Sequence, residues 1–373
     1  MKKIRFIFGT RPEAIKCAPL IIELKKHPQQ FDVTVLVTAQ HREMLDQVIS
    51  FFEIPVDDDL NLMTPNQNLS QLTSDAIRQI TPILKKNRPD VVIVQGDTTT
   101  AYVGALAAFY QKIPVAHLEA GLRSFDPYSP FPEEMNRKLI SQLATYHFAP
   151  TDKAVENLNT EGIKKHVYMV GNTVVDALHI GLEKLKQLDR TPIQSHFSQV
   201  NFSNRIIYVT GHRRENLGEP LTNICQALSD ITENFEDVEI IYPVHKNPQV
   251  QDIVQKALSG KPRIHLIDPL DYTHQLWLME KCHFIITDSG GIQEEAPSLG
   301  KPVLVTRNVT ERTEGIQNGS AKLVGSDTQS ILESASQLLS GNNLFDRMSA
   351  SGNPYGDGQA VERVVGVLGK SLN

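Results

Sequence analysis

The segment with the plainest chemical character in this chain reads DSGGIQEE at residues 288–295. It follows the apolar run 283–287 and leads into a helix-compatible segment, so it predicts a strand that turns into the start of a helix. The two adjacent glycines lack Cβ atoms, so a phosphate could approach their backbone, where N–H groups and the positive end of the helix dipole would face it. The two glutamates would lie in the first turns and could accept hydrogen bonds from ribose hydroxyls. A tight turn with two solvated glutamates explains the octapeptide equally well.

Acidic side chains stand at three further places where chemistry is plausible. Asp97 follows the apolar run 91–94, Glu119 follows the run 115–118, and Glu133 stands in a proline-fixed loop before a helix. Because the carboxyl ends of parallel strands meet at one edge of a sheet, we expect these carboxylates to converge. Each one alone is more simply an N-cap or an ion-pair partner. Together they indicate acid–base chemistry, since crowding away from water raises carboxylate pKa values.

Basic side chains accompany the same predicted strand ends. Arg11 and Lys16 could both reach a phosphate, although a solvated helix face is the alternative. His212, after Gly211 and before two arginines, suits a diphosphate or a leaving oxygen better than a core position. The remaining histidines are scattered without the spacing of metal ligands, so no catalytic metal is expected. The basic candidates are Arg11, Lys16, His212, Arg213, Arg214 and Arg312.

Composition limits the classes of protein that remain. A chain of 373 residues exceeds what one hydrophobic core usually organises, so two domains are expected. A net charge of -6 argues against a nucleic-acid surface. The isolated cysteines at 17, 225 and 282 indicate a reducing compartment and no structural zinc, which predicts the cytoplasm. No run of about 18 apolar residues is present, so no membrane span is expected, and the charged N-terminus reads as a strand rather than a signal peptide.

Short apolar runs alternate with amphipathic stretches along the whole chain, which predicts parallel sheets covered by helices. Helices are expected at 13–26 and 69–86, and the rhythm breaks near 171–173 and across 188–204, of which we favour the first as the hinge. The predicted strands are 4–8, 33–37, 91–94, 115–118, 206–209, 238–242, 264–267, 284–286 and 303–305.

The two halves repeat one short pattern, because 9–13 and 211–215 both read Gly-x-Arg-x-Glu directly after a predicted strand. This fits two doubly wound domains that each present a loop at the carboxyl ends of their strands, with the ligand between them. Neither loop is Gly-x-Gly-x-x-Gly, so the dinucleotide fingerprint is absent and NAD is not expected as a redox cofactor.

Nine longer motifs follow one another along the chain. They are FGTRPEAIK at 8–16, TAQHREMLDQV at 38–48, GDTTT at 96–100, HLEAGLR at 117–123, PEEMNR at 132–137, GNTVVDAL at 171–178, GHRRE at 211–215, DSGGIQEEAPSLGKPVLV at 288–305 and NPYGDGQA at 353–360. In this order they resemble the bacterial non-hydrolysing UDP-N-acetylglucosamine 2-epimerases across nearly the whole chain.

The resemblance implies an α/β GT-B fold, with two doubly wound Rossmann-like domains facing each other across a cleft. Residues 1–171 with 356–373 would form the N-terminal domain that carries the catalytic carboxylates, and 172–355 the domain that binds UDP. It also implies a homodimer that needs no cofactor. Carried over by position, Asp97, Glu119, Glu133 and His212 would be catalytic, and the UDP contacts would come from Arg11, Lys16, His212, Arg213, Ser289, Gly290, Gly291, Glu295 and Arg312.

The implied reaction is reversible epimerisation at C2 of UDP-N-acetylglucosamine, giving UDP-N-acetylmannosamine for surface polysaccharides. The C2 proton has no adjacent carbonyl to acidify it, so elimination of UDP to a 2-acetamidoglucal and re-addition replaces simple deprotonation. Protonation on opposite faces then needs separate carriers. A GT-B glycosyltransferase, a hydrolysing 2-epimerase and a non-catalytic nucleotide-sugar sensor are the alternatives that share the fold.

This chain departs from the family pattern at a few positions. Gln95 stands where a histidine commonly precedes Gly-Asp, and Ala116 where glycine is frequent, and neither is expected to touch a proposed proton carrier. Some relatives are activated by substrate bound near 40–43 and Asn66. The Gln and Arg expected near Glu43 and Asn66 are missing, which leaves such activation unsupported.

Overall fold

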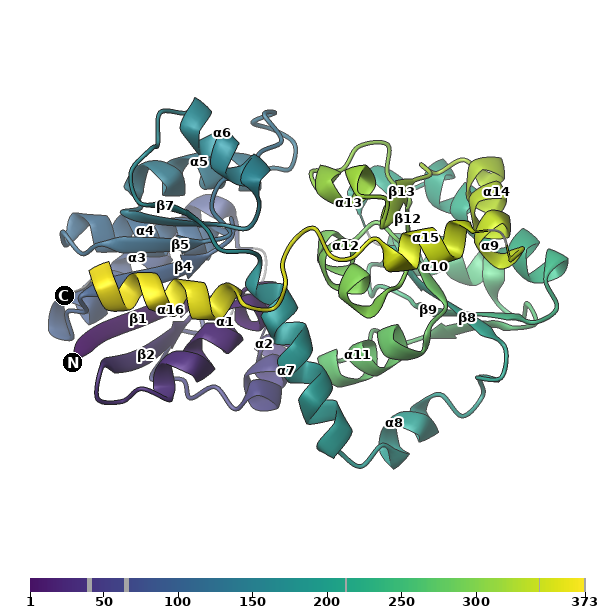
Figure 1. Cartoon of the computed structure of the whole chain (residues 1–373), viewed down its shortest axis with the longest axis horizontal. Coiled ribbons are helices and arrows are strands. Elements are labelled where there is room, and N and C mark those ends of the chain that lie inside the picture. Colours follow the sequence, from purple (N-terminus) through teal and green to yellow (C-terminus); the bar gives the residue numbers. More distant parts are fainter. Residues whose placement is uncertain (39–41, 64–66, 212, 342, 372–373) are drawn as a thin grey trace. The chain divides into compact units, whose positions relative to one another are not determined.

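The computed structural model describes the chain except for residues 39–41, 64–66, 212, 342 and 372–373. The chain forms two compact units, which we call the N-terminal unit (Met1–Ile180 with Tyr355–Asn373) and the C-terminal unit (Gly181–Pro354). Helix α7 (Thr173–Gln187) runs across the boundary between them, and the division predicted at 171–172 lies just before this helix. Figure 1 shows the last helix, α16 (Ala360–Ser371), beside α1 (Arg11–Lys25), so the chain ends in the unit where it begins.

The N-terminal unit is built on a seven-stranded parallel sheet in the order β3-β2-β1-β4-β5-β6-β7. Its middle strands β1, β4 and β5 are mostly apolar and almost entirely buried. Strands covered by helices on both faces of a parallel sheet have no solvent-facing side, which explains this composition. The strands are β1 (Lys2–Phe8), β2 (Phe31–Val37), β3 (Asp58–Asp59), β4 (Val91–Gln95), β5 (Val115–Leu118), β6 (Tyr146–Ala149) and β7 (Val167–Met169).

Apolar periodicity, capping residues and a proline in the first turn mark the helices of this unit in the sequence. In α3 (Leu69–Lys86) the buried side chains recur every four residues, and Asn68 caps the first turn by accepting a hydrogen bond of 2.9 Å from the Gln71 backbone N–H. In α1, Pro12 occupies the first turn, where its missing N–H costs nothing. The others are α2 (Arg42–Phe52), α4 (Thr99–Tyr110), α5 (Glu133–Leu143) and α6 (Asp152–Thr160).

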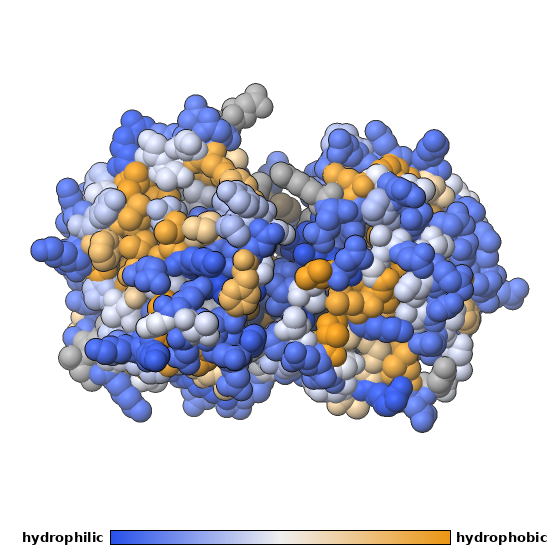
Figure 2. All heavy atoms as spheres, turned by 90° about the horizontal axis from the view of Figure 1, so that it is seen from above, coloured by the Kyte–Doolittle hydropathy of each residue, from blue (hydrophilic) through white to orange (hydrophobic). Residues whose placement is uncertain are grey.

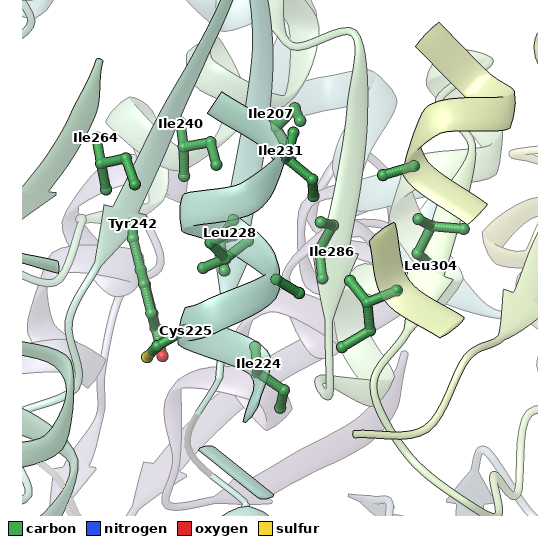
Figure 3. Packing of buried hydrophobic residues seen from close by; sticks show 14 of the residues in the cluster. Ile207, Ile224, Cys225, Leu228, Ile231, Ile240, Tyr242, Ile264, Ile286 and Leu304 are labelled. Carbon is green, nitrogen blue, oxygen red and sulfur yellow. The ribbon is translucent and has the colours of Figure 1, made fainter. Parts of the chain in front are cut away.

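The C-terminal unit repeats this plan with a six-stranded parallel sheet in the order β10-β9-β8-β11-β12-β13. Figure 3 shows its core, in which Ile224, Leu228 and Ile231 of helix α9 (Glu219–Asn234) lie among buried strand residues. The strands are β8 (Arg205–Thr210), β9 (Val238–Pro243), β10 (Ile264–Ile267), β11 (Phe284–Thr287), β12 (Val303–Val305) and β13 (Ala321–Leu323).

Helices and short 3₁₀ turns connect these strands. The α-helices besides α9 are α8 (Thr191–His196), α10 (Pro248–Leu258), α11 (Tyr272–Lys281), α12 (Gly290–Glu295), α13 (Thr313–Gln317), α14 (Thr328–Leu339) and α15 (Leu344–Ala350), and the 3₁₀ turns are η1 (Arg214–Asn216) and η2 (Ala296–Leu299). No helix within the described part of the chain is long and apolar enough to cross a bilayer. Hydrophilic side chains occupy much of the face drawn in Figure 2, with smaller hydrophobic areas on both units.

In both sheets the order of the strands along the sheet reverses direction at the strand that comes first in the chain. In the N-terminal unit the reversal lies between β1 and β4, and in the C-terminal unit it lies between β8 and β11. The prediction of two doubly wound Rossmann-like domains is therefore confirmed, as is the GT-B fold class. Open α/β sheets bind ligands at the carboxyl ends of the strands beside such a reversal. The two Gly-x-Arg-x-Glu segments follow β1 and β8, so each of them starts at one of these points.

All nine predicted strands are present, within two residues at each end. Helix 69–86 is confirmed in full, whereas the helix expected from residue 13 begins at Arg11. The prediction omitted β3, β6, β7 and β13, and α8 lies inside the stretch 188–204 that was expected to be irregular.

Candidate active site

Asp97 is fixed by helix α5 rather than left free at the end of β4. The Arg137 Nε donates a hydrogen bond of 2.9 Å to Asp97 Oδ2, and a second guanidinium nitrogen lies 2.7 Å from the same oxygen. The side-chain amide of Asn136 donates to the Asp97 carbonyl at 2.9 Å. Because α5 begins at Glu133, this one helix sets the positions of two predicted catalytic carboxylates. Arg137 is not among the predicted site residues, although its place four residues after Glu133 puts both on neighbouring turns.

Glu119 occupies an unusual backbone conformation directly after β5. Its φ of 65° lies in the left-handed region, which a residue with a Cβ atom seldom adopts. Its carboxylate is held from two sides, by the Lys16 ammonium at 2.6 Å from Oε1 and by the Gln95 side-chain amide, which donates to Oε2. The side chains of Lys16 and Glu119 are only 9% and 8% exposed. Strain of this kind clusters at functional sites, which supports a role for Glu119 beyond packing.

The contact between Gln95 and Glu119 corrects one expectation. Gln95 was expected to touch no proposed proton carrier, and this is wrong. The parallel register places Gln95 beside Leu118, so its side chain is next to the residue that follows β5. An amide in this position donates a hydrogen bond without titrating.

Glu133 differs from the other two carboxylates in its surroundings. Its Oε2 is buried without a hydrogen-bond partner among the described residues. The neighbouring Glu134 is fully buried and accepts from the backbone N–H groups of Ser124 and Phe125 at 2.9 and 3.1 Å. The two adjacent glutamates therefore divide their roles, because Glu134 holds the preceding loop while Glu133 keeps an oxygen available for a ligand or a proton.

A buried histidine supports the turn that presents Asp97. His117 Nε2 lies 2.7 Å from the carbonyl oxygen of Gly96, and burial lowers the pKa of His117 to about 3. The imidazole is therefore neutral, and it donates its Nε2–H to this carbonyl. Gly96, with a φ of 70°, makes the turn immediately before Asp97. His117 belongs to the HLEAGLR motif but is not among the predicted site residues.

In the C-terminal unit, the glycine turn at the start of α12 lies against a guanidinium. A Cβ atom on Gly290 would stand 2.8 Å from Arg312 Cζ, whereas one on Gly291 would meet only the Ser289 hydroxyl at 4.0 Å. Arg312 Nε donates to Glu294 Oε1 at 3.0 Å, and Arg312 also pairs with Glu311. Burial and the neighbouring arginines act in opposite directions on Glu311, and the arginines hold its pKa well below the ordinary value.

Burial of the two glutamates decides between the interpretations of the octapeptide. Glu294 is 1% exposed and Glu295 is 4% exposed, so a turn with two solvated glutamates is wrong. Glu294 Oε1 lies 3.0 Å from a guanidinium nitrogen of Arg312, and the expectation that Glu294 accepts from ribose stays a prediction. Helix α12 spans only six residues before it tightens into η2, so its dipole is smaller than that of a long helix.

The loop after β8 is tied to the glycine turn by a buried carboxylate. Asp288 is fully buried and accepts hydrogen bonds from the Arg213 backbone N–H at 2.9 Å and from the Asn216 side-chain amide at 3.1 Å. The same amide of Asn216 also donates to the Thr306 carbonyl at 3.0 Å. The structure therefore places the backbone of Arg213 next to Asp288, the residue directly before Ser289, at the reversal between β8 and β11.

The contacts above do not include every predicted residue. His212 lies outside the described residues, as do Gln40, His41 and Asn66. Glu43 is in the first turn of α2. Arg11 is the first residue of α1, directly after the loop at the end of β1. Within the described residues, no group of three or more His, Cys, Asp or Glu side chains is arranged to hold a metal ion.

Known proteins match this chain over almost its full length. A family model described as UDP-N-acetylglucosamine 2-epimerase matches residues 22–369. A UDP-N-acetylglucosamine 2-epimerase of Escherichia coli K12 is 49% identical over 369 residues, covering 98% of each chain. A crystal structure of UDP-GlcNAc 2-epimerase from Neisseria meningitidis bound to UDP-GlcNAc superposes with a TM-score of 0.94 at 48% identity, covering 99% of this chain and 100% of that one. The S. aureus MnaA-UDP co-structure gives a TM-score of 0.91 at 46% identity, covering 100% and 97%.

Proposed function

The chain belongs to the UDP-N-acetylglucosamine 2-epimerase family, and we propose that it interconverts UDP-N-acetylglucosamine and UDP-N-acetylmannosamine by elimination and re-addition of UDP. It is an isomerase of the non-hydrolysing kind. The observation that carries the mechanism is the group of carboxylates at the ends of β4 and β5 and the start of α5. Glu119 is held by Lys16 and Gln95, Asp97 is held by Arg137, and Glu133 keeps a buried oxygen without a partner in the described chain.

The chemistry assigns these carboxylates to proton transfer at C2. In the first half-reaction a carboxylate removes the C2 proton, the C1–O bond to UDP breaks, and its electron pair leaves on the diphosphate. The product is a 2-acetamidoglucal with a double bond between C1 and C2. In the second half-reaction UDP adds back to C1 while a carboxylic acid delivers a proton to the opposite face of C2. Proton carriers on two faces require at least two groups, and each contributes roughly 10² to 10⁴ in rate.

UDP must stay bound while the glucal exists, so the second requirement is a nucleotide site. We assign the diphosphate to the glycine turn with Arg11, His212 and Arg213, and the ribose to Glu295. Arg312 supports this assignment because its guanidinium lies against the backbone of Gly290. The Lys16 ammonium forms an ion pair with Glu119 at 2.6 Å. A diphosphate bound near Arg11 would compete with Glu119 for the positive charge of Lys16. Supply of surface polysaccharide precursors and a homodimeric assembly remain predictions from the resemblance, and a cytoplasmic location remains a prediction from the isolated cysteines.

The rival functions make different demands on the same fold. A glycosyltransferase needs a nucleotide site and an acceptor groove, but it has no use for several carboxylates around C2. A nucleotide-sugar sensor needs no acids at all. A hydrolysing epimerase would use similar groups but would release free sugar and UDP. The products therefore separate these functions.

The wild-type protein incubated in D₂O with UDP-N-acetylglucosamine alone is expected to form the manno epimer with one deuterium at C2. The solvent isotope enters because the carboxylic acid that returns the proton exchanges with water before it does so. Proton NMR and mass spectrometry measure the epimer ratio and the incorporation. Free sugar accumulating with UDP would indicate the hydrolysing reaction instead. An epimer without deuterium at C2 would rule out the proposed proton transfer.

Replacing Gly290 by valine is expected to weaken UDP binding by about tenfold or more, because the new side chain displaces Arg312 and covers the backbone that the phosphate approaches. Gly291→Ala is the matched comparison, since its Cβ fits the free protein and isolates the effect on phosphate approach. Calorimetry gives the dissociation constants, and thermal unfolding checks that both variants are folded. Unchanged affinity in both would remove the glycine turn from the diphosphate site.

A further inference from the structure

A carboxylate that the proposed mechanism does not use lies at the reversal between β1 and β4. Glu13 is the third residue of α1 and is 1% exposed. Its Oε2 accepts three hydrogen bonds from the preceding loop, from the Gly9 N–H at 3.0 Å, the Thr10 N–H at 2.8 Å and the Thr10 hydroxyl at 2.8 Å. These bonds fix the loop that leads into Arg11.

The other oxygen of the same carboxylate crosses to the neighbouring strand end. The Thr98 hydroxyl donates to Glu13 Oε1 at 2.7 Å, and it also accepts from the Ala101 N–H at 3.0 Å, which caps helix α4. Thr98 directly follows Asp97. Glu13 therefore joins the loop that carries Arg11 to the loop that carries Asp97, and we call this set of bonds among Glu13, Thr98 and the Gly9–Thr10 loop the Glu13 clasp.

The loops around the clasp are packed without spare room. A Cβ atom on Gly9 would stand 2.0 Å from the Thr38 hydroxyl oxygen and 2.8 Å from that of Thr100. Those two hydroxyls are hydrogen-bonded to each other at 2.8 Å. A side chain at residue 9 would therefore collide with Thr38, just after β2, and with Thr100, in the first turn of α4, so the backbone of this loop packs closely against both.

Helix capping alone does not account for this arrangement. An ordinary capping glutamate bonds the backbone at its own helix start and stays in water. Glu13 is buried and has no ion-pair partner in the described chain, and its Oε1 accepts a hydrogen bond from Thr98, which follows a different strand. Burying a carboxylate without a cation costs stability, and burial raises the pKa of Glu13 to about 7 against the lowering effect of its four donors. Glu13 thus combines a burial cost with hydrogen bonds to two strand ends.

We propose that Glu13 is a positioning residue that, through the Glu13 clasp, fixes the Arg11 loop and the Asp97 loop relative to each other for turnover. This inference rests on the proposed function, because it assumes that Arg11 and Asp97 act on the same substrate. If Glu13 has this role, breaking the clasp shifts Arg11 or Asp97 from its working position but leaves both side chains present. Misplacement by about 1 Å can cost on the order of 10² in rate.

Two variants break the clasp from opposite sides. Glu13→Gln keeps the shape and one acceptor oxygen but removes the charge, and Thr98→Val removes the donor. Thr98→Ser restores the hydroxyl and is the rescue variant. Glu239→Gln is the matched control, because Glu239 is also a buried carboxylate, 5% exposed, that accepts from the Asn201 N–H and contacts His265, but at the start of β9 in the other unit.

The expected result is a fall in kcat of roughly 10-fold to 10²-fold in Glu13→Gln and Thr98→Val, with KM changed little and Thr98→Ser close to the wild type. Glu239→Gln should lose thermal stability and keep its kcat. A purely structural role would lower the unfolding temperature of the clasp variants without changing kcat of the folded enzyme. Wild-type kcat in both folded clasp variants would overturn the proposal.

Hydrogen exchange of backbone amides separates this proposal from the proposed function. Both clasp variants should exchange faster than the wild type at residues 9–12 and at 97–100 together, while Glu239→Gln should not. If the wild type converts no UDP-N-acetylglucosamine, the proposed function fails and the exchange experiment alone decides the clasp. Unchanged exchange in either loop would then overturn it.

Discussion

We expect kcat to fall by about 10²-fold or more in each of the variants Asp97→Asn, Glu119→Gln and Glu133→Gln, while the folded protein still binds UDP. An amide cannot accept the C2 proton or return it. Glu133→Gln is the cleanest of the three, because Glu133 Oε2 has no hydrogen-bond partner among the described residues whose loss could confuse the result. The other two changes also remove the charge that pairs with Arg137 or Lys16. Steady-state kinetics and calorimetry with UDP measure both effects.

Asp90→Asn provides the control for a general loss of negative charge. Asp90 precedes β4, at the opposite end of the strand from Asp97, and accepts one hydrogen bond of 2.7 Å from the Lys3 N–H. Its variant should turn over at the wild-type rate. Some of the three site variants are expected to release 2-acetamidoglucal and UDP, because elimination can proceed where re-addition is blocked. Wild-type turnover in all three would place proton transfer on other residues.

The stability of the wild type is expected to fall with rising pH relative to Glu13→Gln. Burial raises the pKa of Glu13 from 4.5 to about 7, so the folded state keeps a proton that the unfolded state has lost across that interval. The stabilisation is complete below pH 4.5 and is lost as the pH rises through 7. At 1.36 kcal/mol per pKa unit, the difference in unfolding free energy changes by roughly 3 kcal/mol between pH 4.5 and pH 8.

Urea unfolding of the wild type and of Glu13→Gln at a series of pH values measures this difference in unfolding free energy. Other shifted groups, such as the buried His117 and His147 with lowered pKa values, titrate in both proteins and cancel in the difference. The glutamine variant should therefore become the relatively more stable protein as the solution turns alkaline. Parallel stability curves for the two proteins would show that Glu13 does not titrate in this range.

Three of the four strands that sequence reasoning missed share a physical reason. Apolar runs identify strands buried on both faces, and the runs at β1, β4 and β8 are of that kind. β7 is a three-residue edge strand that is partly exposed, and β3 has only two residues, both aspartates. β13 is also a three-residue edge strand and is partly exposed, so these three missed strands are too short to give a continuous apolar run. β6 is fully buried and, like the predicted β5, contains a buried histidine, so His147 alone does not explain why β6 was missed.

The sequence places the candidate carboxylates at strand ends, but it does not predict their contacts. The positions of Asp97 and Glu119 follow from the βαβ rhythm alone, because each comes directly after a buried strand. The bond from Gln95 to Glu119 depends on which strands are neighbours and in which register, and neither can be read from one strand. For the same reason the sequence could not reveal that Glu13 reaches Thr98. Long-range hydrogen bonds require the pairing of elements that sequence patterns leave open.

The return of α16 to the N-terminal unit determines the order in which a growing polypeptide can complete its parts. Val361, Val364 and Leu368 are buried, and the Val361 N–H donates to Asp176 at 3.0 Å, so the last helix is part of the core of that unit. The C-terminal unit is one continuous segment and is finished when residue 354 has been made. Domains generally fold as units during synthesis, the first-made domain first. Here the half that leaves the ribosome first waits for the final helix, and the second half is complete before it.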